Sequence, residues 1–272
     1  MKKVMFLTLA LVSLYANEEL REKALSKGLR PIPKDFSTLK SLREQAQGPT
    51  QASFEMASTP ELIESRVGKN PEYIKAFRKV FGEDEITFDN ITKAIAAYEK
   101  ILVTRSSYDE FLEGNETTLT KEEKRGLNLF IDMGCKACHF GPAVGGQKIQ
   151  KFPLRAYNSI IDLTTTFDEK THKRHFSQMH FNTKMYHPFP FKNVGGFLGK
   201  NGTCYFRVPI LRNISKTAPY FHNGSVKELR EVIKMMGKYQ LGIDMTKGQL
   251  DALEAFLKSL DGKLVEYNLT KK

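Results

Sequence analysis

The residues with the most definite chemistry in this chain are Cys135, Cys138 and His139, in the run CKACH. Two thiols separated by two residues can add to the two vinyl groups of one porphyrin, and the imidazole that follows can coordinate its iron. This spacing is the attachment signature of c-type haem. The sequence therefore predicts one covalently bound haem c, attached through Cys135 and Cys138, with His139 as an axial iron ligand.

Two other uses of these residues remain open, a zinc site and a redox dithiol. Zinc needs further Cys or His ligands close by, and the remaining thiol, Cys204, lies far downstream. A redox dithiol has no need of the histidine. Covalent haem is the interpretation that uses both thiols and the imidazole, and Cys204 is then predicted to be a free, partly buried thiol.

Spacing alone does not choose the second axial ligand of the iron. Either a methionine or a second histidine is chemically suitable. Each methionine can instead be a flexible core residue, and most of the histidines lie in a stretch with loop-like composition. The candidates after the CKACH run are Met179, Met185, Met235, Met236, Met245, His172, His175, His180, His187 and His222.

Two capped helices are expected to hold the CKACH run in place. Thr120 and Glu123 form a capping box ahead of a helix over residues 121–132, which ends at Gly134, directly before the first cysteine. A second capping box, Thr246 with Gln249, precedes an apolar stripe. Packing of these two helices against each other is the arrangement that a small cytochrome c domain requires.

The first half of the chain also has helix signals. Thr59 and Pro60 begin a short helix, and the apolar spacing over residues 72–81 predicts another that ends at Gly82. A third has an apolar stripe that we expect to be core, formed by Ile91, Ala94, Ile95, Tyr98 and Leu102.

These patterns predict an all-α fold with two helical blocks, near residues 37–115 and 118–263. Residues 145–205 carry many Gly, Pro, Phe and polar residues without clear periodicity. We expect a long loop region there with a short hairpin, and a loop of that length usually has a function or covers a cofactor. No internal repeat is visible.

The composition is that of an ordinary globular protein. Its 272 residues are 40% hydrophobic and 27% charged, with a formal net charge of +11, three Cys and no Trp. A disordered chain, a multispan membrane protein and a disulfide scaffold are therefore excluded. The basic balance fits an acidic partner protein or an anionic surface, or serves solubility alone, and no basic tract typical of nucleic-acid binding is present.

The first sixteen residues have the pattern of an export signal. Lys2 and Lys3 precede an apolar run from Val4 to Leu14, and Ala16 is a suitable cleavage position. The run is too short to span a bilayer, so we expect no stable membrane insertion. An anchor or a buried first helix is the alternative. Cleavage after residue 16 predicts an exported, periplasmic protein.

Several runs together resemble the bacterial di-haem cytochrome c peroxidase family. Four resemble its second haem domain, four resemble the later part of its first domain, and one resembles the start of its mature chain. In that order they are GLNLFIDMGCKACH (126–139), GPAVGGQ (141–147), FRVPILRNISKTAPYFHNGS (206–225), EVIKMMGKYQLG (231–242), EQAQGP (44–49), QASFEM (51–56), PEYIKAF (71–77), ITFDNITKAIAAYE (86–99) and ELREKALSKGLRPIP (19–33).

The chain departs from that family in one respect. Members carry two haem-attachment motifs, whereas this sequence contains one. Between Pro33 and Leu42 it steps from the family's beginning to a point well inside the first domain. The resemblance therefore implies an internally shortened member that lacks the peroxide-reactive haem and keeps the haem that receives electrons.

The resemblance also implies a division of the chain into domains. Residues 1–16 are the signal peptide, and residues 17–115 correspond to a truncated helical first domain without a haem motif. Residues 116–265 correspond to a cytochrome c-like haem domain with long loops. Residues 266–272 form a basic tail.

Site residues follow from the resemblance position by position. His139 corresponds to the proximal ligand and Met236 to the distal one, with Met235 beside it as the fallback. Gln45 and Glu55 match the polar pair that flanks bound peroxide in the family, where the carboxylate moves a proton. Without a facing haem these two side chains lose that purpose.

Thr217 and Pro219 match positions whose backbone carbonyls help to bind calcium in the family. An asparagine that completes that site falls in the missing segment. Calcium binding is therefore expected to be weak or absent.

Two functions are compatible with these residues. One is a periplasmic peroxidase that reduces hydrogen peroxide with electrons from a small donor cytochrome, and the family commonly works as a homodimer. The other is a mono-haem electron-transfer cytochrome in which His139 and Met236 saturate the iron. A relic that folds poorly is a third reading, against which the intact helix stripes argue.

Overall fold

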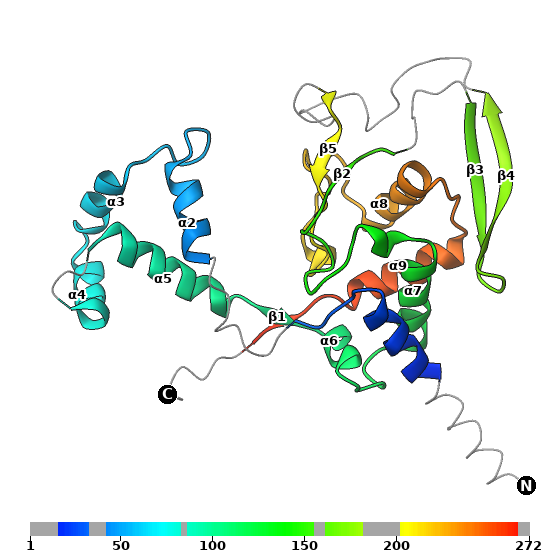
Figure 1. Ribbon diagram of the computed structural model, residues 1–272, viewed down its shortest axis with the longest axis horizontal. Helices are drawn as coiled ribbons and strands as arrows, with labels where there is room; N and C mark the ends of the chain where they lie inside the picture. Colours follow the sequence, from blue (N-terminus) through cyan, green and yellow to red (C-terminus); the bar gives the residue numbers. More distant parts are fainter. Residues whose placement is uncertain (1–15, 33–41, 83–85, 155–160, 182–201, 266–272) are drawn as a thin grey trace, which may run out of the picture. The chain divides into compact units, whose positions relative to one another are not determined.

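The computed structural model describes residues 16–32, 42–82, 86–154, 161–181 and 202–265, and the chain forms two compact units (Figure 1). Unit 1 contains the residues up to Ile32 together with Arg105–Lys263. Unit 2 contains Pro33–Thr104 together with the residues from Leu264 onward. The CKACH run therefore belongs to unit 1, whereas Gln45 and Glu55 belong to unit 2.

These units divide the chain at other places than the domain boundary that the resemblance implies. Residues 16–32 and 105–115 pack within unit 1, the unit that contains the CKACH run. A parallel bridge between Leu29 and Gly141 is one of the contacts that hold the first of these segments. The domain boundary between residues 115 and 116 stays a prediction that rests on the resemblance to the family. The compact units of the structure have different limits.

Helices form most of the core of unit 1. The capping boxes predicted from Thr120 with Glu123 and from Thr246 with Gln249 are both present. The helical segments are residues 16–26, α6 (Ser107–Leu112), α7 (Lys121–Asp132), α8 (Leu229–Met235), the π-helical turn Met236–Leu241 that continues α8, and α9 (Lys247–Lys258).

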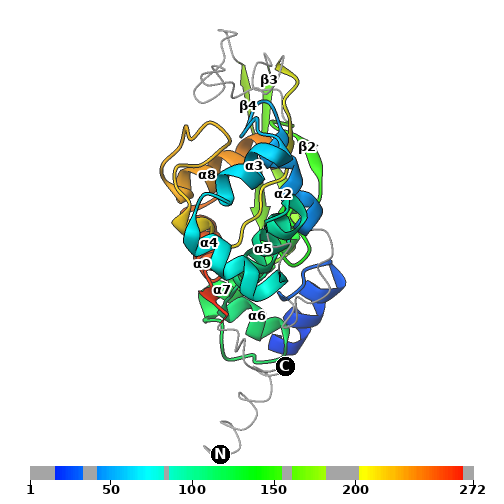
Figure 2. The same cartoon turned by 90° about the vertical axis from the view of Figure 1, so that its left-hand side faces the viewer.

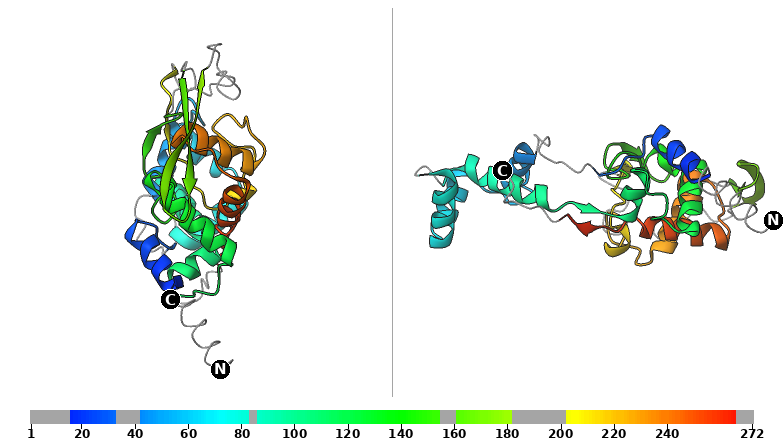
Figure 3. Two further views of the ribbon diagram at one scale, coloured as in Figure 1. Left: turned by 90° about the vertical axis from the view of Figure 1, so that its right-hand side faces the viewer. Right: turned by 90° about the horizontal axis from the view of Figure 1, so that it is seen from below.

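Helices α7 and α9 cross at very short range (Figure 3), which confirms the predicted packing of the two capped helices. The crossing requires Gly126, because a Cβ there would lie 1.9 Å from the carbonyl oxygen of Ala252. Phe130 packs on Phe256 with ring centroids 5.1 Å apart. The other large side chains fully buried in this core are Tyr108, Phe111, Leu29, Leu127, Leu129, Met133, Ile243, Leu253 and Leu260.

Paired strands interrupt the helical fold, so the all-α prediction was incomplete. Antiparallel pairs join β3 (Ile161–Asp168) to β4 (Lys173–Phe181) and β2 (Ile149–Lys151) to β5 (Tyr205–Arg207). The β3–β4 hairpin is longer than the short hairpin expected within residues 145–205. Its Thr and Ile residues suit a strand, although the polar Thr run conceals the pattern. The short strands β1 (Thr104–Arg105) and β6 (Lys263–Leu264) also pair.

Unit 2 consists mainly of helices that begin where the sequence predicts. Thr59 caps one helix by accepting from the amide of Leu62 at 3.3 Å, and Gly82 ends another with a φ of 85°. The helix α5 packs against α2 and α3 (Figure 2). The elements are α2 (Leu42–Gln51), α3 (Pro60–Val67), α4 (Pro71–Phe81) and α5 (Phe88–Ile101).

The apolar stripe of α5 is buried only in part. Ile91 is buried as predicted, but Tyr98 is 60% exposed and Leu102 47% exposed, so the prediction that these two are core was wrong. The spacing of a stripe indicates which side chains share a helix face. It does not indicate whether enough neighbouring elements exist to cover the whole face.

None of the helices within the described residues is long and apolar enough to cross a membrane. The predicted export signal falls on residues 1–16, and residues 1–15 of it lie outside the described ranges.

Candidate haem site

Helix α7 leads directly into the attachment run. The chain turns through Gly134, whose φ of 102° is a left-handed conformation that glycine adopts at little cost. Cys135–Ala137 then form a 3₁₀ turn. The amides of Cys138 and His139 donate to the carbonyl of Cys135 at 3.2 and 3.1 Å. Both thiols and the imidazole therefore lie on one tight turn at the end of a buried helix.

Both thiols of the attachment turn are free. Burial raises the pKa of Cys135 to about 12, and the positive charge of Arg174 acts in the opposite direction. A thiol with so high a pKa holds almost no thiolate at neutral pH, which argues against a redox dithiol. Within the described ranges, no three His, Cys, Asp or Glu side chains gather as a metal ion would require.

His139 is buried and prepared to act as a ligand. His139 is only 8% exposed, and its Nδ1 makes no hydrogen bond. Burial lowers the pKa of His139 to about 4, while the backbone carbonyls of Val144 and Pro209 act in the opposite direction. The imidazole is therefore neutral, which is the form that binds a metal. A buried neutral imidazole beside two free thiols fits covalently attached haem.

The loop after His139 is tied to the segment that precedes α8. The amide of Gly146 donates to the carbonyl of Val208 at 2.9 Å, and the amide of Leu211 donates to the carbonyl of Ala143 at 3.2 Å. These bonds bring residues 206–212, which belong to one of the family-like runs, against the loop that follows the CKACH run. Two distant parts of the sequence thus form one wall of the site.

A buried ion pair fixes this wall. Arg212 binds Asp109 through two bonds of 2.7 Å, and both side chains are almost fully buried. The same guanidinium donates to the carbonyl of Pro142 at 2.9 Å and to the hydroxyl of Ser106 at 3.1 Å. The amide of Ile32 donates to Asp109 at 2.6 Å. The Arg212–Asp109 pair therefore joins α6, Ile32 and the loop after His139.

Sequence reasoning missed this pair although a signal was present. Arg212 stands in the mainly apolar run VPILRN, and a charged residue in a segment that is to be buried needs a partner. The identity of that partner could not be inferred, because Asp109 lies 103 residues away and its position depends on the fold.

The two adjacent methionines after α8 have different surroundings. Met235 is 6% exposed and belongs to a small apolar cluster with Val226, Phe152 and Phe221. Met236 begins the π-helical turn and is half-buried. Met235 is thus packed in this cluster, whereas Met236 lies outside it. The assignment of Met236 as the distal ligand stays a prediction.

The other candidate axial ligands have varied positions. The side chain of Met245 packs against Gly237, so closely that a Cβ at Gly237 would lie 2.7 Å from its Cε. His222 is exposed and stacks on Phe206, with ring centroids 4.4 Å apart. His172 and His175 are exposed residues of the β3–β4 hairpin. Met179 and His180 lie in β4, and Met185 and His187 lie outside the described residues.

The residues predicted to handle peroxide belong to a different compact unit from the attachment turn. Gln45 is an exposed residue of α2, and Glu55 is an exposed residue of the turn that follows it. Both belong to unit 2, whereas Cys135 and His139 belong to unit 1. The structure therefore groups Cys135, Cys138 and His139 on one turn but leaves the predicted proton-transfer pair untested.

The two residues predicted to contribute to calcium binding are close together and exposed. The hydroxyl of Thr217 donates to the carbonyl of Ile214 at 3.1 Å, and Pro219 lies two residues further on. Any role of their carbonyls toward calcium stays a prediction. Cys204 is free, as predicted, and is buried, with its Sγ 3.4 Å from the carbonyl oxygen of Gly202.

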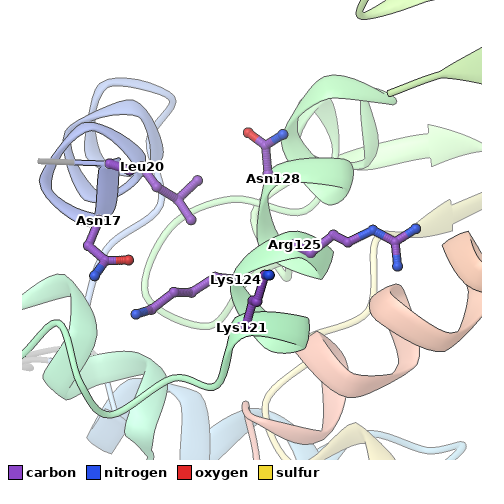
Figure 4. A pocket seen from close by; sticks show the side chains of 7 residues that line it. Asn17, Leu20, Lys121, Lys124, Arg125 and Asn128 are labelled. Atoms are coloured by element: carbon purple, nitrogen blue, oxygen red, sulfur yellow. The ribbon is translucent and has the colours of Figure 1, made fainter. Parts of the chain in front are cut away.

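A pocket of about 530 Å³ lies between the first described helix and α7 (Figure 4). Lys124 of α7 and Leu20 of the first helix extend into it. Its lining on α7 runs from Lys121 to Asn128, whereas the attachment turn follows the C-terminal end of that helix, so it is distinct from the haem site. It is lined by Ala16, Asn17, Leu20, Lys121, Lys124, Arg125 and Asn128.

Comparison with known proteins agrees with this geometry. Residues 22–117 match the family model described as di-haem cytochrome c peroxidase. The chain is 38% identical over 236 residues to the cytochrome c551 peroxidase of Nitrosomonas europaea and 39% identical over 235 residues to that of Pseudomonas aeruginosa. Each of these alignments covers 85% of this chain and 61% of the relative, so the chain spans about three-fifths of their length.

One solved structure is similar over most of the chain. It is the crystal structure of a MauG-like protein associated with microbial copper homeostasis. The TM-score is 0.55 at 25% sequence identity, and the match covers 87% of this chain and 73% of that protein. The overall fold of the chain is therefore similar to that of a MauG-like protein.

Proposed function

The chain belongs to the di-haem cytochrome c peroxidase family, and from this premise we propose that it is a periplasmic c-type haem oxidoreductase. It takes electrons from a small donor cytochrome and reduces hydrogen peroxide to two molecules of water, which consumes two electrons and two protons. The observation that supports this most is the assembled attachment turn, with a buried neutral His139 beside two free thiols, in a chain 38–39% identical to two cytochrome c551 peroxidases.

Four side chains hold the prosthetic group in this proposal. Cys135 and Cys138 would attach it through thioether bonds, His139 would be a permanent ligand of its iron, and Met236 would be an exchangeable one. When bound, haem c supplies a one-electron redox centre, and a His/Met ligand pair raises its potential. A raised potential suits the acceptance of electrons from another cytochrome.

The protein supplies the environment of that centre. Burial keeps His139 neutral, so that the imidazole presents a lone pair to a metal. Arg212 and Asp109 hold the loop after His139 against residues 208–212. The helix crossing at Gly126 fixes the end of α7 from which the attachment turn starts. These contacts keep the proximal ligand in one orientation.

Haem content and the reaction with peroxide together test the proposal. The chain is produced in a host that assembles c-type haem, and we expect one haem per chain, rapid oxidation of the reduced protein by peroxide, and turnover with a donor cytochrome. Glu55→Ala should lower that turnover, because a carboxylate that moves a proton is lost. Glu44→Ala, a change of another exposed carboxylate on α2, serves as the control. Turnover no greater than that of free haem, unchanged by Glu55→Ala, contradicts the proposal.

A second function is favoured by one specific observation. Gln45 and Glu55 are exposed in unit 2, and the haem ligands belong to unit 1. If Met236 stays bound to the iron permanently, as His139 does, the chain is an electron-transfer cytochrome that does not turn over peroxide. This alternative predicts a thioether-to-iron charge-transfer band in the oxidised protein, lost in Met236→Ala, and a reduced form inert to peroxide. Absence of the band in the unmodified protein rules it out.

Location and partners complete the proposal. The apolar run after Lys2 and Lys3 directs export, and the periplasm is where a c-type haem protein meets a small donor cytochrome. We also propose a homodimer, by analogy with the family, and weak or absent binding of calcium at Thr217 and Pro219. Light scattering of the haem-loaded chain, with and without calcium, tests both statements.

A further inference from the structure

The β3–β4 hairpin contacts the rest of unit 1 through its tip and through both strands (Figures 1 and 3). A two-stranded hairpin is marginally stable by itself in water. Contacts with other elements must therefore keep it in place. Among the described residues, these contacts go to α7 and the residues just after it, to α9, and to the segment that follows Met236.

The tip of the hairpin lies along α7. Arg125 binds Glu169 through two bonds of 2.9 and 2.8 Å. The Nδ1 of His172 lies 2.8 Å from a carboxylate oxygen of Asp132. Arg125 and Asp132 are seven residues apart, which places them on one face of the helix. The tip thus follows α7 toward its end, where the attachment turn begins.

One strand of the hairpin also pairs with the segment that follows Met236. The amide and hydroxyl of Thr165 donate to the carbonyl of Gly242 at 3.0 and 2.7 Å. The amide of Asp244 donates to the carbonyl of Thr165 at 2.8 Å. Residues 242–244 therefore take their position from β3.

Arg174 of β4 connects the two segments directly. Its Nη2 donates to the carbonyl of Met133 at 2.7 Å, and its Nη1 donates to the carbonyl of Leu241 at 3.0 Å. The first carbonyl is at the C-cap of α7, just before the attachment turn, and the second ends the turn that begins at Met236. Carbonyls at helix C-termini lack helical partners and carry partial negative charge, so a guanidinium with several donors suits both.

We propose that Arg174 is a positioning residue that holds the segment of the distal methionine against the attachment turn. This inference rests on the proposed function, because it takes His139 and Met236 as the axial ligands. The guanidinium joins the ends of their two segments and so limits how far Met236 can move from the iron. The hairpin thereby controls how often the distal position opens.

Two measurements on the haem-loaded chain test the proposal. One is hydrogen exchange of the amides at residues 237–243, and the other is the rate at which the reduced protein binds carbon monoxide, which requires an open distal position. In Arg174→Gln we expect hydrogen exchange and carbon monoxide binding each to be about tenfold faster than in the matched control. A change of about tenfold is what the loss of a hydrogen bond from a charged donor produces. The control is Lys173→Gln, which removes one positive charge from the neighbouring exposed position of β4.

Two further variants separate position from charge. Arg174→Lys keeps the charge but presents a single ammonium group, so we expect rates between those of the unmodified protein and Arg174→Gln. Thr165→Val removes one bond to Gly242 from β3 and should accelerate both processes by a smaller factor. It also serves as the test if Arg174→Gln does not fold. Equal exchange in Arg174→Gln and Lys173→Gln overturns the proposal, as does full restoration of both rates by Arg174→Lys.

Failure of the proposed function would look different. If the unmodified oxidised protein lacks the thioether-to-iron charge-transfer band, Met236 is not a ligand and the proposed ligand pair is wrong. Hydrogen exchange at residues 237–243 depends on the hairpin and not on the identity of the ligand. It therefore still decides whether Arg174 holds that segment.

Discussion

Units 1 and 2 form their helices from the same local signals but differ in how much apolar surface they bury. Among the described residues, the largest fully buried side chains, such as Phe256 and Leu127, all belong to unit 1. In the described part of unit 2, the buried apolar side chains are Ala46, Ile91 and Ala96. Its exposed large apolar side chains are Phe54, Met56, Leu62, Tyr73, Val80, Tyr98, Leu102 and Leu264.

The difference separates helix formation from stability. In unit 2, Thr59, Asn70 and Thr87 each accept a hydrogen bond from a backbone amide of the first helical turn, as Thr120 and Thr246 do in unit 1. Such a cap is worth about 1 kcal/mol. Most helical stability in a folded protein comes from packing of the apolar face. Unit 2 therefore has well-defined helix ends but a small buried core. Unit 1 has well-defined helix ends and a large buried core.

The largest effect is expected from breaking the buried ion pair of unit 1. Arg212→Leu leaves the carboxylate of Asp109 buried without its partner, and removal of one member of such a pair costs about 3–5 kcal/mol. Urea unfolding of the haem-loaded chain measures the loss. The variant should also loosen the loop after His139, because the bond to Pro142 is lost.

An ion pair of unit 2 provides the matched control for that experiment. Lys93 lies 2.7 Å from Asp89 on α5, and both side chains are more than 40% exposed. Lys93→Leu should leave the unfolding curve unchanged, because solvent screens an exposed pair. Equal losses from Arg212→Leu and Lys93→Leu would contradict the contrast between the units.

A pair of glycine substitutions sharpens the contrast further. Gly126→Ala places a Cβ 1.9 Å from a backbone oxygen of α9, so the helix crossing must widen, at a cost of about 1–3 kcal/mol. At Gly48, in α2 of unit 2, a Cβ meets nothing within 4 Å. Gly48→Ala should therefore be neutral or stabilising, since Ala is the better helix former. Thermal unfolding measures the stability of both variants. A larger loss of stability from Gly48→Ala than from Gly126→Ala would contradict the contrast between the units.

Limited proteolysis compares the units in the unmodified protein. We expect the first cuts within residues 42–101, because a region with few buried apolar contacts opens locally at low cost. The haem-attached fragment that contains α7 and α9 should survive. Mass spectrometry of the early fragments locates the cuts. First cuts within residues 107–151 or 205–260 would mean that unit 2 is the more stable part.

The features predicted well from sequence are those with local causes. The capping boxes at Thr120 and Thr246 join residues three positions apart, so each can be recognised without knowledge of the fold. The attachment turn is local as well, since Cys135 and His139 are separated by three residues. These signals also placed the two helices that cross at the centre of unit 1.

The features that were missed depend on contacts between distant residues. Tyr98 and Leu102 share a stripe with the buried Ile91, but their exposure depends on which elements surround α5. The β3–β4 hairpin was underestimated because its polar Thr run resembles a loop until a partner strand is known. Arg174 bridges carbonyls of Met133 and Leu241, which no sequence pattern relates to it.

The smallest effect is expected at the tip of the β3–β4 hairpin, where the exposed ion pair between Arg125 and Glu169 holds the tip against α7. Hydrogen bonding to Arg125 lowers the pKa of Glu169, so the pair stabilises the fold at neutral pH, and this contribution is lost as the pH falls through the lowered pKa. Both side chains are about one-third exposed, which limits the contribution to less than about 1 kcal/mol. Glu169→Gln should therefore cost little at neutral pH and reduce the acid sensitivity of unfolding.

A double-mutant cycle decides whether that pair is the cause. In the background of Arg125→Gln, the further change Glu169→Gln should have no effect on the pH dependence, because the interaction has already been removed. Urea unfolding at neutral and acid pH measures each corner of the cycle. If Glu169→Gln has its full effect in that background, the acid sensitivity comes from another partner of Glu169. The position of the tip would then depend less on Arg125 than on Gln249, whose side-chain amide donates to the carbonyl of Phe167 at 2.8 Å. In that case the hairpin would be held mainly by a contact with the buried core of unit 1.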